Sequence, residues 1–132
     1  MTLETARVVE VAEFRAALRR FLRQSERVAR KSGLTPQRHL LLLMIKGARD
    51  GSERSTVTEL ADRLQLAQST VTELVSRAEE AGLVERQQSQ RDARVAYLRL
   101  TADGEQRLED SFTALGTERA QLREAFSAFD VG

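Results

Sequence analysis

Cysteine is absent from the 132-residue sequence, and proline occurs only once. Without cysteine the chain has no disulfides, no catalytic thiolate, no cysteine redox sensor and no zinc site built on thiolates. No apolar run approaches the length of a membrane span, and the first ten residues carry charges instead of the apolar core of a signal peptide. We therefore expect a cytoplasmic protein.

Residues suited to catalysis are also scarce. His39 is the only histidine, and it stands beside an apolar run, where a packed or surface residue is more common than a catalytic base. The sequence has no Ser/His/Asp set, no paired-carboxylate site and no glycine-rich phosphate loop. We expect no enzyme activity, no metal site and no cofactor.

The rest of the composition is typical of one globular domain, with 41% hydrophobic and 31% charged residues. The net charge of +1 argues neither for nor against a nucleic-acid partner. All basic residues except Lys31 and Lys46 are arginine. Arginine suits contacts to phosphate and guanine, although genome composition can produce the same bias.

The stretch from Gln68 to Gly82 predicts an amphipathic helix with Gly82 at its C-terminal end. Its apolar residues recur at helical spacing and are Val71, Leu74, Val75 and Ala78. The opposite face carries short or planar hydrogen-bonding side chains, which are Ser69, Thr72, Glu73, Ser76 and Arg77. Serine and threonine are mediocre helix formers, so their presence lowers the intrinsic stability of this helix. A role in hydrogen bonding to base edges in a major groove is one reason for such residues to be there. The alternative is a solvated face, which would more often carry lysine and glutamate.

Three helices are predicted before this stretch. The first covers residues from about 5 to 31, and its wide apolar stripe packs either in a core or against a second subunit. Thr35 and Pro36 open the second helix, which we expect to be buried nearly all round because residues 40–45 are all apolar. Thr56 and Glu59 form a capping box for the third helix. Residues 65–67 then make the short connection of a helix-turn-helix.

After Gly82 the apolar period changes from 3.6 to 2 residues, which predicts a β-hairpin. One strand begins at Leu83, the other covers residues 94–100, and the polar residues 89–93 lie between them. A hairpin directly after a helix-turn-helix is a winged helix. Thr101 caps a last helical region. Gly116 interrupts it, so that one bent helix and two short helices are both possible.

In residues 34–104 the sequence resembles the MarR family of bacterial transcription regulators. The matching blocks occur in family order and spacing, and are Leu34-Thr35-Pro36 with Leu41; Thr56-Val57-Thr58-Glu59-Leu60-Ala61; Ser69-Thr70-Val71-Thr72 with Leu74, Val75 and Arg77; Gly82-Leu83-Val84 with Arg86; Asp92 with Arg94; and Leu98, Leu100, Thr101 and Gly104. One departure is Ala67, where a helix-capping serine, aspartate or asparagine is usual.

The resemblance implies a mostly α (α+β) fold with a winged helix-turn-helix lobe at residues 34–100 between dimerisation helices at residues 1–33 and 101–132. It further implies a single domain that regulates transcription by binding double-stranded DNA. We expect a repressor that binds a pseudo-palindromic operator as a homodimer and is released by a small aromatic ligand. The alternative is a winged helix used only for protein contacts, against which the arginine-rich wing argues.

The resemblance also assigns roles to residues. The DNA-binding set expected on the recognition helix is Gln68, Ser69, Thr70, Thr72, Glu73, Ser76 and Arg77. Glu73 accepts a hydrogen bond from cytosine or holds Arg77, and Arg77 reads guanine, grips phosphate or only pairs with Glu73. On the wing the expected set is Arg86, Arg91, Asp92 and Arg94, in which Asp92 holds Arg94 at or near the minor groove.

Two further sets of residues are expected outside the DNA-binding surface. The effector is expected near Arg15, Arg19 and His39, where the first two helices meet the last ones. The dimer interface is expected to use the large apolar side chains of Phe14, Leu18, Phe21, Phe112, Phe126 and Phe129. These are too many for the ends of a small lobe to bury alone.

Overall fold

The computed structural model describes residues 2–129 and the side chains of residues 2–128. Within that part of the chain there are six helices and three strands, which confirms the mostly α (α+β) class. The order is α1 (Thr5–Lys31), α2 (Pro36–Lys46), β1 (Arg54–Ser55), α3 (Val57–Leu64), α4 (Gln68–Glu80), β2 (Val84–Gln88), β3 (Ala96–Leu100), α5 (Ala102–Ala114) and α6 (Gly116–Phe129). None of the described helices is long and apolar enough to cross a membrane.

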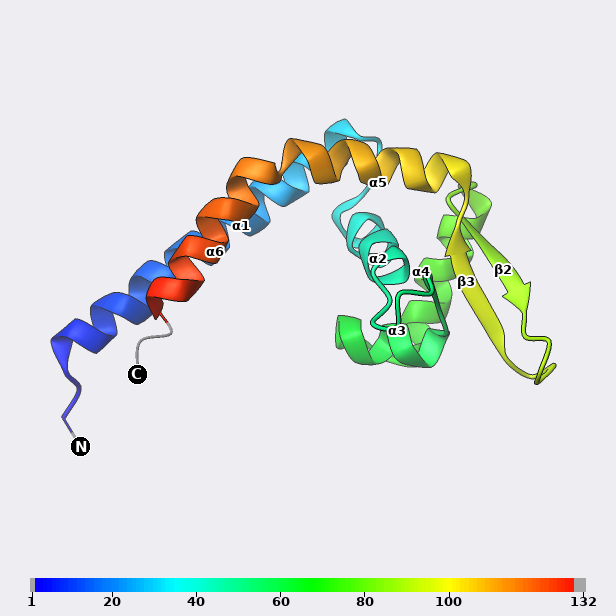
Figure 1. Cartoon of the computed structure of the whole chain (residues 1–132), viewed down its shortest axis with the longest axis horizontal. Helices are drawn as coiled ribbons and strands as arrows, with labels where there is room; N and C mark the ends of the chain where they lie inside the picture. Colours follow the sequence, from blue (N-terminus) through cyan, green and yellow to red (C-terminus); the bar gives the residue numbers. More distant parts are fainter. Residues whose placement is uncertain (1, 130–132) are drawn as a thin grey trace.

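The molecule has two parts of different shape. Helices α1 and α6 run side by side as an extended arm, and residues 34–100 form a lobe at one end of it, with α5 between the two (Figure 1). The wing strands β2 and β3 lie at the end of the lobe farthest from the arm (Figure 1). The chain therefore separates a long helical arm from a small lobe of helices and a three-stranded sheet.

The lobe has its own hydrophobic core. The large apolar side chains that are completely buried come from α2, α3, α4 and β3, and they are Leu41, Leu42, Ile45, Leu60, Val71, Val75 and Leu98. Burial of one such side chain contributes roughly 1.5–3 kcal/mol. The prediction that α2 is buried nearly all round is wrong on one side. Leu40 is 41% exposed, because that side of α2 borders a cavity beside the arm.

The helix-turn-helix forms as its end signals predict. Thr35 Oγ1 accepts a hydrogen bond from the Arg38 backbone N–H, with Pro36 in the first turn of α2. Thr56 and Glu59 make both halves of the capping box that begins α3. Gln65 adopts a left-handed conformation, with φ of 56°, and this closes the short turn into α4.

The sheet has three antiparallel strands in the order β1-β3-β2. The predicted hairpin is confirmed by the pairing of β2 with β3, in which Val84 lies opposite Leu100. The second strand begins at Ala96, two residues later than the sequence pattern indicated. The edge strand β1, where Arg54 lies opposite Arg99, was not predicted. Its two residues are too few to show a period.

The start of α5 is fastened to the lobe. Thr101 Oγ1 accepts the Gly104 backbone N–H and donates to the Gly82 carbonyl at 2.6 Å. Gly82 has φ of 74°, as its predicted role at the end of α4 requires. Gly104 lies so close to Leu83 that a Cβ there would overlap the Leu83 carbonyl oxygen. Helix α5 therefore moves with the wing and α4.

A second set of polar contacts supports this attachment. Lys46 Nζ lies 2.8 Å from Glu105 Oε1 on α5 and 3.0 Å from Glu53 Oε2, and both hydrogen bonds raise the pKa of the Lys46 ammonium. Arg107 Nη1 donates to the carbonyl of Ser32, in the turn between α1 and α2. The C-terminal region is divided at Leu115 and Gly116 into two helices, which decides the question that the sequence left open.

Candidate nucleic-acid interface

Helix α4 presents one polar face to solvent. Val71, Val75 and Ala78 are buried in the lobe, Leu74 and Glu79 are half-buried, and the other residues of the helix are exposed. All members of the set expected on this helix are exposed, and they are Gln68, Ser69, Thr70, Thr72, Glu73, Ser76 and Arg77. The apolar stripe fixes the rotation of α4, and that rotation turns the short polar side chains outward.

The N-terminus of α4 has no side-chain cap. Ala67 occupies the N-cap position, and its methyl group accepts no hydrogen bond from the first backbone N–H groups. The Gln68 side chain donates instead to Thr58 Oγ1 on α3 at 3.4 Å. A helix N-terminus favours an anion, since its free N–H groups carry partial positive charge.

Arg77 and Glu73 form an ion pair one helical turn apart, with Nη2 and Oε1 separated by 2.7 Å. Both side chains are 64% exposed, so the pair contributes little to stability. Arg77 can therefore exchange Glu73 for another anion at small cost. The structure contains the pairing that the sequence left as one alternative for Glu73.

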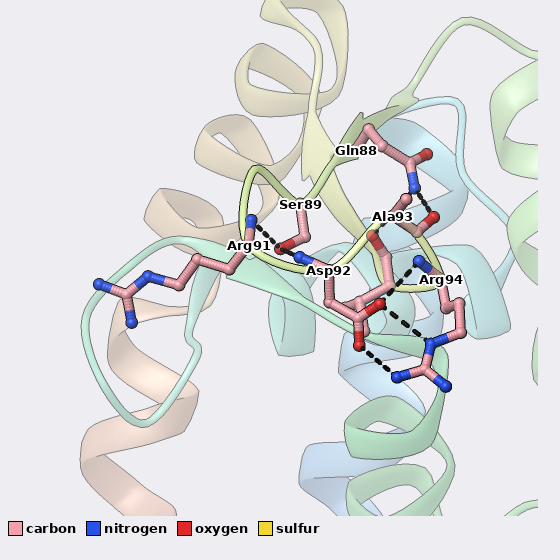
Figure 2. Close-up of polar contacts among 7 residues, drawn as sticks. Gln88, Ser89, Arg91, Asp92, Ala93 and Arg94 are labelled. Carbon is pink, nitrogen blue, oxygen red and sulfur yellow. Dashed lines mark hydrogen bonds and ion pairs between the residues drawn. The ribbon is translucent and has the colours of Figure 1, made fainter.

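The wing tip is a hydrogen-bonded loop (Figure 2). Ser89 Oγ accepts the backbone N–H groups of Arg91 and Asp92, both at 3.2 Å. The Gln88 side-chain amide donates to the carbonyl of Ala93. The Val95 N–H donates to the Asp92 carbonyl at 3.0 Å. These contacts fix the backbone from which the wing arginines project.

Arg94 is oriented by Asp92. Asp92 Oδ1 accepts the backbone N–H of Arg94 at 3.0 Å and its Nε–H at 3.1 Å, and Oδ2 accepts Nη2–H at 3.2 Å. The Arg94 side-chain and backbone hydrogen bonds lower the pKa of the Asp92 carboxyl. The Arg94 side chain is nevertheless 90% exposed. Figure 2 shows Arg91 pointing away from Arg94, so the loop presents positive charge on two sides.

The wing and α4 are joined into one surface by Arg86. Its Nε donates to Glu79 Oε1 on α4 at 3.0 Å, so Arg86 is already engaged with a carboxylate. Arg86, Arg91 and Arg94 are all exposed, and Asp92 is partly buried in the loop. The structure thus brings the expected residues of helix and wing onto neighbouring elements. Their contact with DNA stays a prediction.

The residues expected around an effector do not come together. His39 is 7% exposed and borders a cavity of about 370 Å³ between α1, α2 and the junction of α5 with α6. Burial lowers the pKa of its imidazole. Arg15 does not line this cavity, and Arg19 lines a separate hollow along α1. The side chains of α1 that reach the cavity include Phe21 and Leu22.

Arg119 is the cationic residue of this cavity that sequence reasoning missed. Its guanidinium lies 3.7 Å from the centre of the Phe112 ring, and Nη1 donates to the Phe112 carbonyl at 2.6 Å. Arg119 lies on α6, far from His39 in the sequence, and no local motif connects the two. Among residues 2–129, no group of histidine and carboxylate side chains is placed to hold a metal ion.

The residues expected at a dimer interface lie mainly on the arm. The rings of Phe14 and Phe126 meet edge to face, with 5.7 Å between their centres. Leu18 and Phe21 are half-buried, and Phe112 and Phe126 are 51% and 57% exposed. The side chain of Phe129 lies outside the described residues.

Comparison with known proteins finds transcriptional regulators of the same kind among the relatives. A model of the MarR family matches residues 32–95. The HTH-type transcriptional repressor MdtR of Bacillus subtilis is 34% identical over 80 residues, which are 61% of this chain and 49% of the relative. The chain thus spans about half the length of the curated relatives that it matches.

Solved structures agree over more of the chain. The regulator MosR of M. tuberculosis, in complex with DNA, has a TM-score of 0.62 and 28% identity, covering 89% of this chain and 79% of its own. A mutant MarR from E. coli complexed with operator DNA has a TM-score of 0.67 and 21% identity, covering 82% of this chain and 75% of its own. The second likeness concerns the fold alone.

Proposed function

The chain belongs to the MarR family of transcriptional regulators, and from this premise we propose that it binds double-stranded DNA with sequence specificity. Members of the family are regulators and not enzymes. The observation that carries the proposal is the neighbouring placement of the exposed polar face of α4 and a wing whose Arg94 is held by Asp92. In this proposal α4 enters the major groove and the wing arginines meet the backbone or the minor groove.

We infer that two copies act together through their arms. Among the described residues, the exposed large apolar side chains outside α2 and the turn before α4 all lie on or next to the arm and α5; these are Leu3, Val8, Val9, Val11, Leu22, Phe112 and Phe126. Glu118 Oε2, beside a cavity between α1 and α6, is buried without a hydrogen-bond partner. A second copy packed on this arm would cover the apolar groups and bring donors near Glu118.

Two-fold symmetry of such a dimer leads to an inverted-repeat operator. Recognition helices fit successive major grooves when they are about 34 Å apart, or about ten base pairs centre to centre. The residues proposed to contact DNA remain Gln68, Ser69, Thr70, Thr72, Glu73, Ser76 and Arg77 on α4, with Arg86, Arg91, Asp92 and Arg94 on the wing. A footprint on one short asymmetric site would contradict this arrangement.

The proposal further includes repression of transcription and release from DNA when a small aromatic ligand binds. MdtR is described as a repressor, which supports repression here. The cavity of about 370 Å³ beside His39 and Arg119 is of the size that small-molecule sites have, and its apolar wall includes Phe21, Leu43 and Leu115. A screen of aromatic acids should therefore find compounds that change DNA affinity or melting temperature. If none does so, this part of the proposal is withdrawn.

The experiment that tests DNA binding is selection of bound duplexes from a random pool, followed by affinity measurements at several salt concentrations. Recovery of an inverted repeat whose log Kd varies steeply with log salt supports the proposal. No duplex binding even at low salt supports the alternative, a winged helix that contacts only proteins.

Three alanine variants assign the roles within the site. Arg94→Ala should weaken binding across many sequences and reduce the salt slope by about one for each subunit, whereas Asp92→Ala should cost less because it removes only the orienting partner. Arg77→Ala should cost roughly 1–3 kcal/mol and relax preference at one base position per half-site if Arg77 reads guanine. If Arg77 grips phosphate instead, its loss should resemble that of Arg94. Wild-type affinity for both arginine variants would remove these residues from the site.

A further inference from the structure

The outer face of the wing sheet carries a polar hollow that shares only Arg91 with the proposed DNA-contacting residues. The register places Arg54, Tyr97, Arg99 and Gln87 on this face, since Arg54 lies opposite Arg99 and Gln87 lies opposite Tyr97. The hollow has a volume of about 650 Å³, and its lining is Arg54, Gln87, Gln88, Ser89, Gln90, Arg91 and Tyr97. No acidic residue is among them.

Arg54 is held in place without being neutralised. Its guanidinium lies 4.2 Å from the centre of the Tyr97 ring, a cation–π contact that fixes the side chain and leaves its charge available. Among the described residues, no carboxylate comes within ion-pair distance of Arg54. The neighbouring Glu53 is bonded to Lys46 at 3.0 Å and lies 4.0 Å from Arg99. Hydrogen bonds from Ser52 are the main cause of the lowered pKa of the Asp50 carboxyl. The positive charge of Arg54 adds a smaller electrostatic contribution, without a hydrogen bond between the two side chains.

Arg91 supplies the second cation of the hollow. Its backbone N–H is bonded to Ser89 Oγ, and its side chain leaves the wing loop on the opposite side from Arg94 (Figure 2). Three glutamines of the wing, Gln87, Gln88 and Gln90, also line the hollow. An arginine held by Tyr97, a second arginine, and amide and hydroxyl groups that line the same hollow match the phosphodiester backbone of a nucleic acid.

The position of the wing indicates which part of the DNA is available. The wing lies at the end of the lobe farthest from the arm (Figure 1), so in an arm-to-arm dimer the two wings lie outermost. The outer sheet face then looks away from the centre of the operator. We propose that the hollow between Arg54 and Arg91 binds the phosphate backbone of duplex DNA flanking the operator. This inference rests on the proposed function, and it extends the contact beyond the bases that α4 reads.

Duplex DNA is favoured over an acidic protein segment by continuity with the wing. The loop that holds Arg94 also holds Arg91, so DNA engaged by Arg94 brings further phosphates close to the hollow. The Tyr97 ring is covered by Arg54 and is therefore not free to stack on an exposed base. A double-stranded backbone needs no such stacking.

The test compares two duplexes with the wild-type protein and with Arg54→Ala. One duplex ends at the selected inverted repeat, and the other extends by about ten base pairs on each side. The wild type should bind the longer duplex more tightly and with a steeper salt slope. Arg54→Ala should lose about two units of that slope and bind the longer duplex about thirtyfold more weakly at about 0.15 M salt, as expected for one phosphate contact per lobe and two per dimer. Binding of the shorter duplex should not change.

Matched variants separate this role from a general loss of charge or fold. Arg99→Ala removes an arginine from the same sheet face but outside the hollow, and it should retain the gain from flanking DNA. Tyr97→Phe keeps the aromatic ring and should behave as wild type, whereas Tyr97→Leu should lose part of the gain. Arg54→Gln, which keeps a shorter polar side chain without the charge, should lose it as Arg54→Ala does.

The outcomes are distinguishable. Equal binding of both duplexes by the wild type, or an unchanged gain in Arg54→Ala, overturns the flanking contact and leaves operator binding standing. Absence of binding to either duplex at low salt overturns the proposed function and the flanking contact together.

Discussion

The lobe and the arm use their apolar residues in opposite ways. In the lobe, Leu42, Val75 and Leu98 are completely buried among neighbours of the same chain. Helix α1 has 27 residues, all within the described part of the chain, and of these only Ala29 is buried, whereas Val8, Val11 and Leu22 are about half-exposed. The lobe therefore completes its own core, and the arm leaves apolar surface that another copy would cover. Stability of the lobe should be a property of one chain, and stability of the arm should depend on protein concentration.

The largest effect should come from the core of the lobe. Leu98→Ala removes a completely buried side chain from the central strand, so the free energy of unfolding should fall by roughly 2–5 kcal/mol. Denaturant titration should show the same loss at low and high protein concentration. Leu22→Ala on the arm, where the side chain is 51% exposed, is the control and should change the unfolding of a dilute sample little. If Leu22→Ala lowered the free energy of unfolding more than Leu98→Ala, the contrast between the lobe and the arm would be contradicted.

The next largest effect should come from the arm. Phe126→Asp places a charge in an exposed apolar surface, next to the Phe14 ring, and should weaken dimerisation about thirtyfold, or about 2 kcal/mol. Light scattering at micromolar concentration should show a shift toward monomer, while circular dichroism shows the lobe still folded. A monomeric wild type with intact fold would contradict the dimer itself.

Helix caps distinguish the two parts on a smaller scale. Thr56→Ala removes the side chain that accepts the Glu59 N–H at 3.2 Å, so it should destabilise the lobe by about 1 kcal/mol. Glu4 holds the equivalent position before α1 and makes no side-chain cap. Glu4→Ala should therefore leave the melting temperature nearly unchanged. Equal losses in the two variants would remove this contrast between the lobe and the arm.

The smallest effect concerns pH at the junction of the two parts. The pKa of His39 lies below its ordinary value of 6.5, because burial disfavours the imidazolium. As pH falls below about 6.5, the unfolded chain binds the proton before the folded chain does. The free energy of unfolding should therefore decrease, by at most about 0.8 kcal/mol at pH 6.0, from its full value well above pH 6.5. His39→Leu should remove this part of the pH dependence. An identical pH profile for the variant would show that the imidazole does not contribute.

Much of the fold was predictable because its signals are local. The capping box of Thr56 and Glu59, the proline at the start of α2 and the left-handed Gly82 each act through backbone groups a few residues away. The change of apolar period after Gly82 likewise marked the wing. On the candidate interface, the same periodicity indicated which side chains of α4 face outward.

What escaped prediction depends on contacts between distant segments. Strand β1 exists because β3 offers Arg99 and Leu98 as partners, and nothing in its two residues indicates a strand. Arg119 reaches the cavity beside His39 only through the packing of α6, whereas Arg15 lies outside it. The Ser89 and Gln88 contacts that shape the wing tip also depend on the closed hairpin.

The break between α5 and α6 is a point at which a small change of angle would move the lobe relative to the arm. Helix α5, with 13 residues, is about 20 Å long and is fastened to the lobe at Thr101 and Glu105. A change of about ten degrees at Leu115 and Gly116 swings its far end by about 3.4 Å, which equals one base-pair step along a DNA strand. In the proposed dimer, the angle at this joint and the turn between α1 and α2 therefore together set the spacing of the two lobes on the duplex.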